Sequence, residues 1–111
     1  MLRSEGKKII MDEGDWGLSL PFNLSGDNIQ SNDIFQFKIK KSIYDKEAVI
    51  EKEFTNLTEK DGTFIFVLDF TEEESKKLPE DKYRYSLKQY RNGELLNTVI
   101  KEEYFEVDKG V

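Results

Sequence analysis

The residues of this 111-residue chain that could do chemistry are mostly carboxylates, because the sequence contains no cysteine and no histidine. The chain therefore lacks a thiolate nucleophile, the commonest general base and the commonest metal ligand. A glycosidase-like pair could come from Asp61, Asp69 or Asp81, and it would need the two carboxylates held about 5 to 10 Å apart in a cleft. Adjacent loops on a small domain seldom form such a cleft, so we expect no catalytic residues and no enzymatic activity.

Three acidic residues close together, Asp12, Glu13 and Asp15, suggest a calcium site beside Gly14. Calcium takes about six to eight oxygen ligands, and these residues lack the spacing of an EF-hand loop. A solvated acidic turn is therefore the favoured interpretation. We expect neither a metal ion nor a cofactor.

The chain carries 23 acidic and 17 basic residues, for a net charge of −6. This balance argues against a nucleic-acid partner, which requires a basic face. Lys38, Lys40 and Lys41 form a small basic cluster, interpreted as the solvated face of a strand. No apolar run approaches the roughly 20 residues of a membrane span. The first residues lack the apolar core of a secretory signal, so we expect synthesis in the cytoplasm and no membrane partner.

Aromatic side chains are the remaining candidates for a binding surface, and they make up 13% of the chain. Trp16 could stack on a sugar, but it alternates with apolar residues as in a half-buried strand, which favours a core or partly covered position. Tyr90 and Tyr104 are better candidates for exposed contacts. The possible interaction surface predicted from the sequence consists of Trp16, Tyr90 and Tyr104.

The elements that would position these residues are short β-strands. Apolar and polar residues alternate most clearly over residues 33–40, 64–70 and 82–88, as expected of strands with one buried face. Asn92-Gly93 predicts a type I′ hairpin, and Asp61-Gly62 a turn. Pro21 places its own strand at a sheet edge or a bulge. Weaker strands are expected over residues 7–11, 16–22, 48–55, 94–101 and 104–107.

One short charged segment interrupts this pattern and predicts a helix over about 72–78. Thr71 and Glu74 have the spacing of a capping box, and Pro79 ends the helix. Leu78 is the apolar residue that would dock it on the core. Strands at intervals of roughly 10 residues with one crossover helix predict an all-β antiparallel sandwich of about 7–8 strands. We expect one domain over residues 1–111, with its core over about 9–107.

These features follow one another in a recognisable order. They are Gly14-Asp15, residues 33–40 (DIFQFKIK), residues 61–68 (DGTFIFVL), residues 71–78, residues 81–87 (DKYRYSL), Asn92-Gly93 and residues 104–107 (YFEV). The ordered set resembles the immunoglobulin-like domain of siphophage and prophage tail and baseplate proteins, and it is similar to the N-terminal domain of upper baseplate proteins. That family usually has glycine where this chain has Asp81, which raises the question of whether the turn there requires a positive φ.

The resemblance implies an immunoglobulin-like sandwich with a structural or adaptor role in a phage tail or baseplate. Its partners would be other tail or baseplate proteins, or further copies of itself, and its location the tail of a virion. No catalytic residue is carried over from the family. The alternative is a carbohydrate-binding sandwich that uses Trp16 and Tyr90 as stacking platforms.

Overall fold

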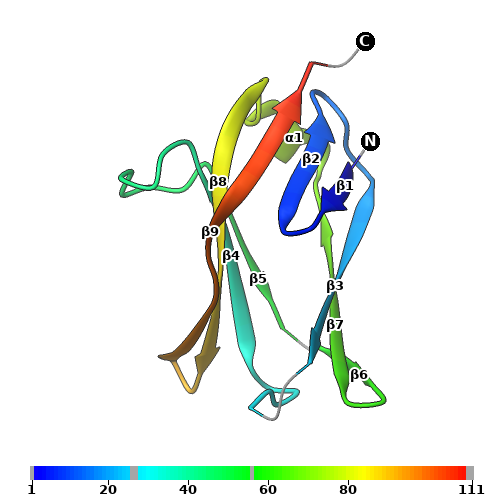
Figure 1. Ribbon diagram of the computed structural model, residues 1–111, viewed down its shortest axis with the longest axis vertical. Helices are drawn as coiled ribbons and strands as arrows, with labels where there is room; N and C mark the ends of the chain where they lie inside the picture. The colour runs from blue at the N-terminus through cyan, green and yellow to red at the C-terminus, as the bar shows by residue number, and fades with distance from the viewer. Residues whose placement is uncertain (1, 26–27, 56, 110–111) are drawn as a thin grey trace.

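The computed structural model describes residues 2–25, 28–55 and 57–109, which form two β-sheets and one short helix (Figure 1). The larger sheet has the strand order β1-β2-β9-β8-β4-β5, and the smaller has the order β3-β7-β6. The strands are β1 (Leu2–Glu5), β2 (Lys8–Asp12), β3 (Ser19–Ser25), β4 (Ile34–Lys40), β5 (Ile50–Phe54), β6 (Thr58–Lys60), β7 (Thr63–Asp69), β8 (Asp81–Arg91) and β9 (Glu94–Asp108).

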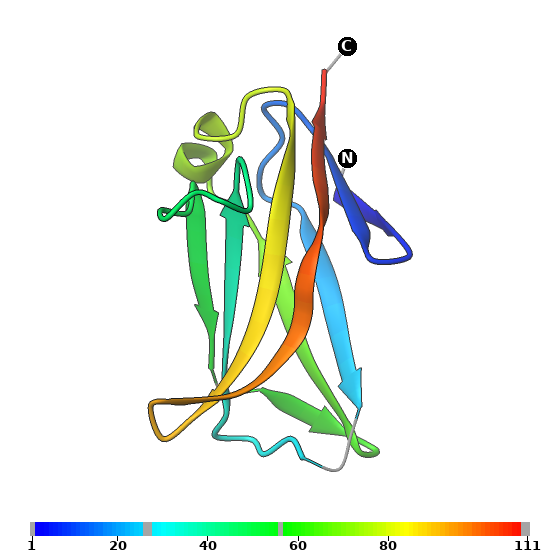
Figure 2. The same cartoon turned by 60° about the vertical axis from the view of Figure 1, so that its left-hand side comes forward.

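The two sheets lie face to face and enclose one core, which confirms the predicted all-β sandwich (Figure 2). Neighbouring strands are antiparallel except β2 and β9, which run parallel. Strands β1 and β2 extend the larger sheet beyond β9, so β9 is not an edge strand. Strands β1 and β6 were not predicted, and the two strands expected over 94–101 and 104–107 are one strand, β9.

The alternating strands bury the apolar faces that the sequence predicts. On β4, Phe35, Phe37 and Ile39 are fully buried, and they face the inward side chains of β7. The Phe66 ring of β7 stacks on Phe54 with ring centroids 4.3 Å apart. Such aromatic pairs add to the free energy of burial, so they fix how the two sheets pack.

Of the two positions predicted for Trp16, core or partly covered, the core position is wrong, because the side chain is 56% exposed. Strand β3 begins only at Ser19, and its half-buried inward side chains start at Leu20. The apolar alternation of the sequence therefore begins before the strand itself, which starts at Ser19. Pro21 lies in β3 at the edge of the smaller sheet, as expected for a residue without a backbone N–H.

The charged segment forms helix α1 (Glu72–Lys76), which carries the chain from β7 in the smaller sheet to β8 in the larger. The Glu74 amide donates to the Thr71 hydroxyl at 3.2 Å, and the Thr71 amide donates to the Glu74 carboxylate at 2.9 Å. This confirms the capping box, although the helix ends at Lys76 rather than near residue 78. Leu78 follows the helix and is fully buried, so it docks the crossover on the core.

Two turns have the backbone that their sequences predict. Asn92 and Gly93 have φ values of 53° and 80° and join β8 to β9, as in a type I′ hairpin. Asp61 and Gly62 have φ values of 52° and 79° between β6 and β7. Asp81 begins β8 and has no positive φ, so this turn does not need the glycine that is usual in the resembling family.

Candidate functional site

The aromatic residues predicted as an interaction surface do not lie together. Trp16 lies between β2 and β3, in a segment tied to the final residues of β9 by the Glu13 amide, which donates to the Asp108 carbonyl at 2.7 Å. Tyr90 pairs with Leu95 near the opposite end of β9, beside the hairpin turn. Since β9 separates Trp16 from Tyr90, these two rings cannot form a single stacking platform.

Tyr90 and Tyr104 project from the outer face of the larger sheet. Tyr90 is half-buried, and its hydroxyl donates to the Gln36 side chain at 3.5 Å. Tyr104 is 42% exposed, with the Arg84 guanidinium carbon 3.8 Å from its ring centroid. Arg84 also donates to the Glu102 carboxylate at 2.7 Å. The stacked pair of Arg84 and Tyr104 is therefore held in place on this face.

Basic side chains from three strands converge on the same outer face. Lys38 and Lys40 on β4, Arg84 and Lys88 on β8, and Lys101 on β9 line a hollow of about 290 Å³, which we call the basic hollow. Lys40 lies directly opposite Arg84 in the strand register. The sequence interpretation of lysines 38 and 40 as a merely solvated strand face missed this convergence. The alternating basic residues of β4 and β8 were the signal that could have revealed it.

The charges of the basic hollow are only partly balanced by the protein. The Lys40 ammonium donates to the Asp45 carbonyl at 2.9 Å, and Arg84 pairs with Glu102. Lys38, Lys88 and Lys101 form no ion pair within 4.0 Å among the described residues. The hollow therefore has a positive charge excess within a protein of net charge −6.

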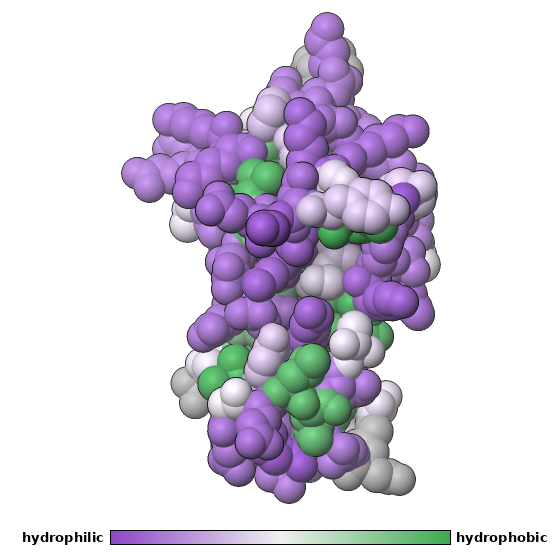
Figure 3. Space-filling model, turned by 90° about the vertical axis from the view of Figure 1, so that its left-hand side faces the viewer, coloured by the Kyte–Doolittle hydropathy of each residue, from purple (hydrophilic) through white to green (hydrophobic). Residues whose placement is uncertain are grey.

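The loop between β4 and β5 contributes one apolar side chain to the hollow and carries an exposed tyrosine. Ile43 lines it and is 42% exposed, and the neighbouring Tyr44 is 88% exposed. The Asp45 carboxylate accepts from the Ser42 amide at 3.1 Å, which gives this loop a defined turn. Sequence reasoning missed Tyr44, because the loop has no periodic pattern that would mark it. Viewed from the side of the larger sheet, the surface is mostly hydrophilic with small, separate hydrophobic patches (Figure 3).

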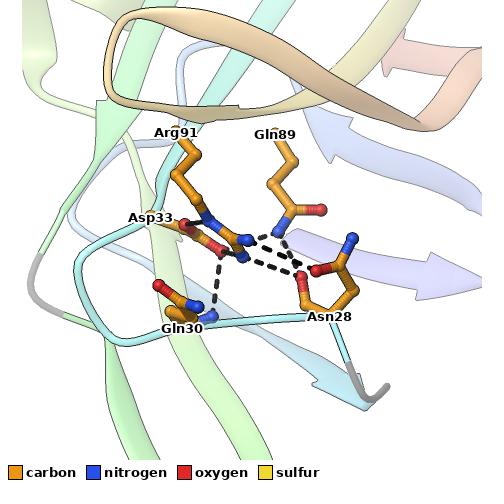
Figure 4. Close-up of polar contacts among 5 residues, drawn as sticks. All are labelled: Asn28, Gln30, Asp33, Gln89 and Arg91. Atoms are coloured by element: carbon orange, nitrogen blue, oxygen red, sulfur yellow. Dashed lines mark hydrogen bonds and ion pairs between the residues drawn. The ribbon is translucent and has the colours of Figure 1, made fainter.

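A buried ionic network holds the start of β4 against the end of β8 (Figure 4). The fully buried Asp33 carboxylate accepts from Arg91 Nε at 2.8 Å and Nη2 at 2.9 Å. It also accepts from the Gln89 amide at 2.7 Å and the Gln30 backbone N–H at 2.9 Å. The hydrogen bonds from Arg91 lower the pKa of Asp33 to about 2, although burial acts in the opposite direction. Both oxygens of the Asp33 carboxylate accept hydrogen bonds from the protein, so this group stabilises the fold.

The Gln89 amide and the Arg91 guanidinium of this network also donate to the Asn28 carbonyl, at 2.9 and 3.1 Å. The segment that precedes β4 is thereby tied to the β8–β9 hairpin (Figure 4). The sequence marked Asp33 only as the first residue of a strand pattern, and nothing in it indicated the distant partners. The network positions β4 and β8, which carry four of the basic groups of the hollow.

Of the carboxylates considered for catalysis, Asp61 and Asp69 lie apart, and Asp69 and Asp81 each contact a lysine. Asp61 precedes β7 and Asp69 is its last residue, so about 20 Å of strand lies between them at about 3.3 Å per residue. The Asp69 carboxylate is 3.8 Å from the Lys52 ammonium, and that of Asp81 is 3.7 Å from the Lys41 ammonium. These contacts are those of surface ion pairs.

The acidic turn considered for calcium has a structural contact instead. The Glu13 carboxylate accepts from the Glu80 backbone N–H at 2.7 Å, which links the turn to the segment before β8. In the part of the chain that the structure describes, no group of three or more acidic side chains is arranged to hold a metal ion. None of the described helices is long and apolar enough to cross a membrane.

The chain was compared with protein families, curated proteins and solved structures. No protein family model, no curated protein and no solved structure matches the chain.

Proposed function

We propose that this protein is a non-catalytic binding module that acts through protein–protein contacts. The observation that supports this function is the composition of the outer face of the larger sheet. The Arg84–Tyr104 stack and the basic hollow lie on this face, and the exposed Tyr44 follows Ile43, which lines the hollow. Tyrosine and arginine are enriched at protein interfaces, and they supply most of the affinity where they are well supported.

We further propose that the module is a structural or adaptor component of a phage or prophage tail or baseplate. The support is the resemblance of residues 9–107 to tail-associated immunoglobulin-like domains, together with the sandwich strand order. Its partners are then other tail or baseplate proteins or further copies of itself, and its location is the virion tail. Repeated subunits are the rule in such symmetric assemblies.

The experiment is to purify induced phage or prophage particles from the host and to search for the protein by mass spectrometry. The tail proposal expects it in intact tails at a fixed ratio to the other components. A tagged protein should also recover tail proteins by co-purification. Absence from particles would refute the tail setting. A stable complex with a protein outside the tail would support the binding function but not the tail setting.

A matched pair of variants tests the face that supports the binding function. Tyr44→Ser removes an 88% exposed aromatic next in sequence to Ile43, and Val67→Ser changes a 45% exposed residue of the smaller sheet. We expect Tyr44→Ser to weaken co-purification of the partner at least about tenfold, since buried interface aromatics contribute roughly 2 kcal/mol or more. Val67→Ser should leave it unchanged. Equal effects from both variants would contradict the assignment of this face.

The carbohydrate-binding alternative is not favoured by the geometry. Its platform required Trp16 and Tyr90 to face one sugar, and they lie toward opposite ends of β9. Tyr90 is also half-buried. Exposed Trp16 alone remains compatible with sugar stacking, and a glycan array on the intact protein tests it.

A further inference from the structure

The basic hollow places like charges next to one another in an acidic protein. Lys40 lies directly opposite Arg84 on the neighbouring strand, and like charges in that register destabilise a sheet. Lys88 lies opposite Gln36 and adds a further charge to the same face. Glu102 balances Arg84, so the unbalanced charges of the hollow are those of its lysines, and a bound anionic group would neutralise them.

We propose that the basic hollow binds an acidic, extended segment of a partner protein. This inference rests on the proposed function as a protein-binding module and names the chemistry of its partner. Carboxylates of the segment would approach the ammonium groups of Lys38, Lys88 and Lys101, which have no ion pair among the described residues. Charge complementarity of this kind steers association and sets the orientation of the partner.

The shape and the apolar lining of the hollow favour a peptide over a small anion. The hollow is open, has a volume of about 290 Å³, and is lined by the Ile43 side chain as well as by cations. A free phosphate would use the charges and leave Ile43 uncovered. A peptide that carries an apolar residue between its acidic residues satisfies both parts of the lining, and Tyr44 in the same loop can extend the contact.

The surroundings of the hollow disfavour nucleic acid. Glu51 and Glu53 on β5 lie opposite Lys38 and Gln36 of β4, so they border the hollow on the same outer face. Glu102 lines the hollow itself. The phosphates of a nucleic acid that extends beyond the hollow would be repelled by these carboxylates and by the protein's net charge of −6. A short acidic peptide can end within the positive region.

The test measures binding of a fluorescent peptide with four glutamates around one leucine to the full chain, by fluorescence anisotropy. The double variant Lys38→Glu/Lys88→Glu changes the hollow. The control Lys60→Glu/Lys77→Glu has the same net charge change at exposed residues of β6 and the end of α1. We expect the hollow variant to bind at least about tenfold more weakly, since each reversal replaces an attraction with a repulsion. The control should stay within about twofold of the wild type, and unfolding curves verify that both variants fold.

Competitors and salt identify the ligand class. Peptide binding should weaken with rising salt, since screening shortens from about 10 Å at 0.1 M to about 3 Å at 1 M. Inorganic phosphate and a single-stranded oligonucleotide of equal charge should compete at least about tenfold less well than the unlabelled peptide. No peptide binding, equal losses in both variants, or stronger competition by either of the other anions would overturn the proposal.

Failure of this inference is distinguishable from failure of the proposed function. If tail proteins co-purify equally with the wild type and with Lys38→Glu/Lys88→Glu, the binding function stands and the hollow is not its site. If no protein partner is recovered with the wild type, the proposed function itself fails.

Discussion

Replacement of Asp33 by asparagine tests the buried ionic network that holds β4 against the β8–β9 hairpin. The substituted amide would keep the shape of the side chain but not its charge, so Arg91 would lose its ionic partner. The Asp33 pKa falls from an ordinary 3.8 to about 2 in the fold. At about 1.4 kcal/mol per pKa unit, this shift corresponds to about 2 kcal/mol of stability at neutral pH. Asp33→Asn should lower the free energy of unfolding by at least this amount.

The pH dependence separates the charge from the shape. The folded pKa of Asp33 lies below its unfolded value, so the stabilisation is fully present above about pH 5 and is lost as the pH falls toward 2. The difference between wild type and Asp33→Asn should shrink by about 1.5 kcal/mol between pH 7 and pH 2.5. The other carboxylates titrate in both proteins, so they cancel in this difference.

The assay is urea unfolding followed by circular dichroism at several pH values, with the free energy extrapolated to water. The control is Asp61→Asn in the exposed β6–β7 turn, where asparagine tolerates the positive φ of 52°. It should change the unfolding free energy by less than about 0.5 kcal/mol. A loss for Asp33→Asn that is the same at pH 7 and pH 2.5 would refute the assignment of its low pKa to the Arg91 pair.

Further predictions concern the crossover and the core. Thr71→Ala removes the N-cap of α1 and should cost about 1 kcal/mol in urea unfolding, while Thr71→Ser should retain most of it; equal losses would contradict the capping role. Leu78→Ala leaves a cavity at a fully buried position and should cost about 2 to 5 kcal/mol, whereas a loss below about 1 kcal/mol would mean that Leu78 does not dock the crossover. Burial raises the pKa of Tyr85 to about 12, so its ionisation, followed by ultraviolet absorbance, should occur near that pH. Because this folded pKa exceeds the unfolded value near 10, the stabilisation from neutral Tyr85 is present below pH 10 and lost between about pH 10 and 12. Tyr85→Phe should lack that decline, and ionisation near pH 10 in the folded protein would contradict its burial.

Features governed by neighbouring residues were predictable from the sequence. The inward faces of β4 and β7 follow from alternation, because successive side chains of a strand point to opposite sides. Asn92-Gly93 follows from the positive φ that its turn requires. The Thr71 capping box follows from a spacing of three residues within one helical turn. Each depends on a few consecutive residues.

Features that depend on which strands become neighbours required the tertiary structure. Trp16 continues an apolar alternation and is nevertheless exposed, because β3 starts three residues later. Asp33 and Arg91 are 58 positions apart, and they meet only because β4 pairs with β8. The basic hollow likewise takes its residues from three strands that are separated along the chain. The sequence by itself determined the strands, the turns and the capped crossover, since these are local. Strand pairing alone decided which charged side chains lie together, because it brings distant residues within reach of one another.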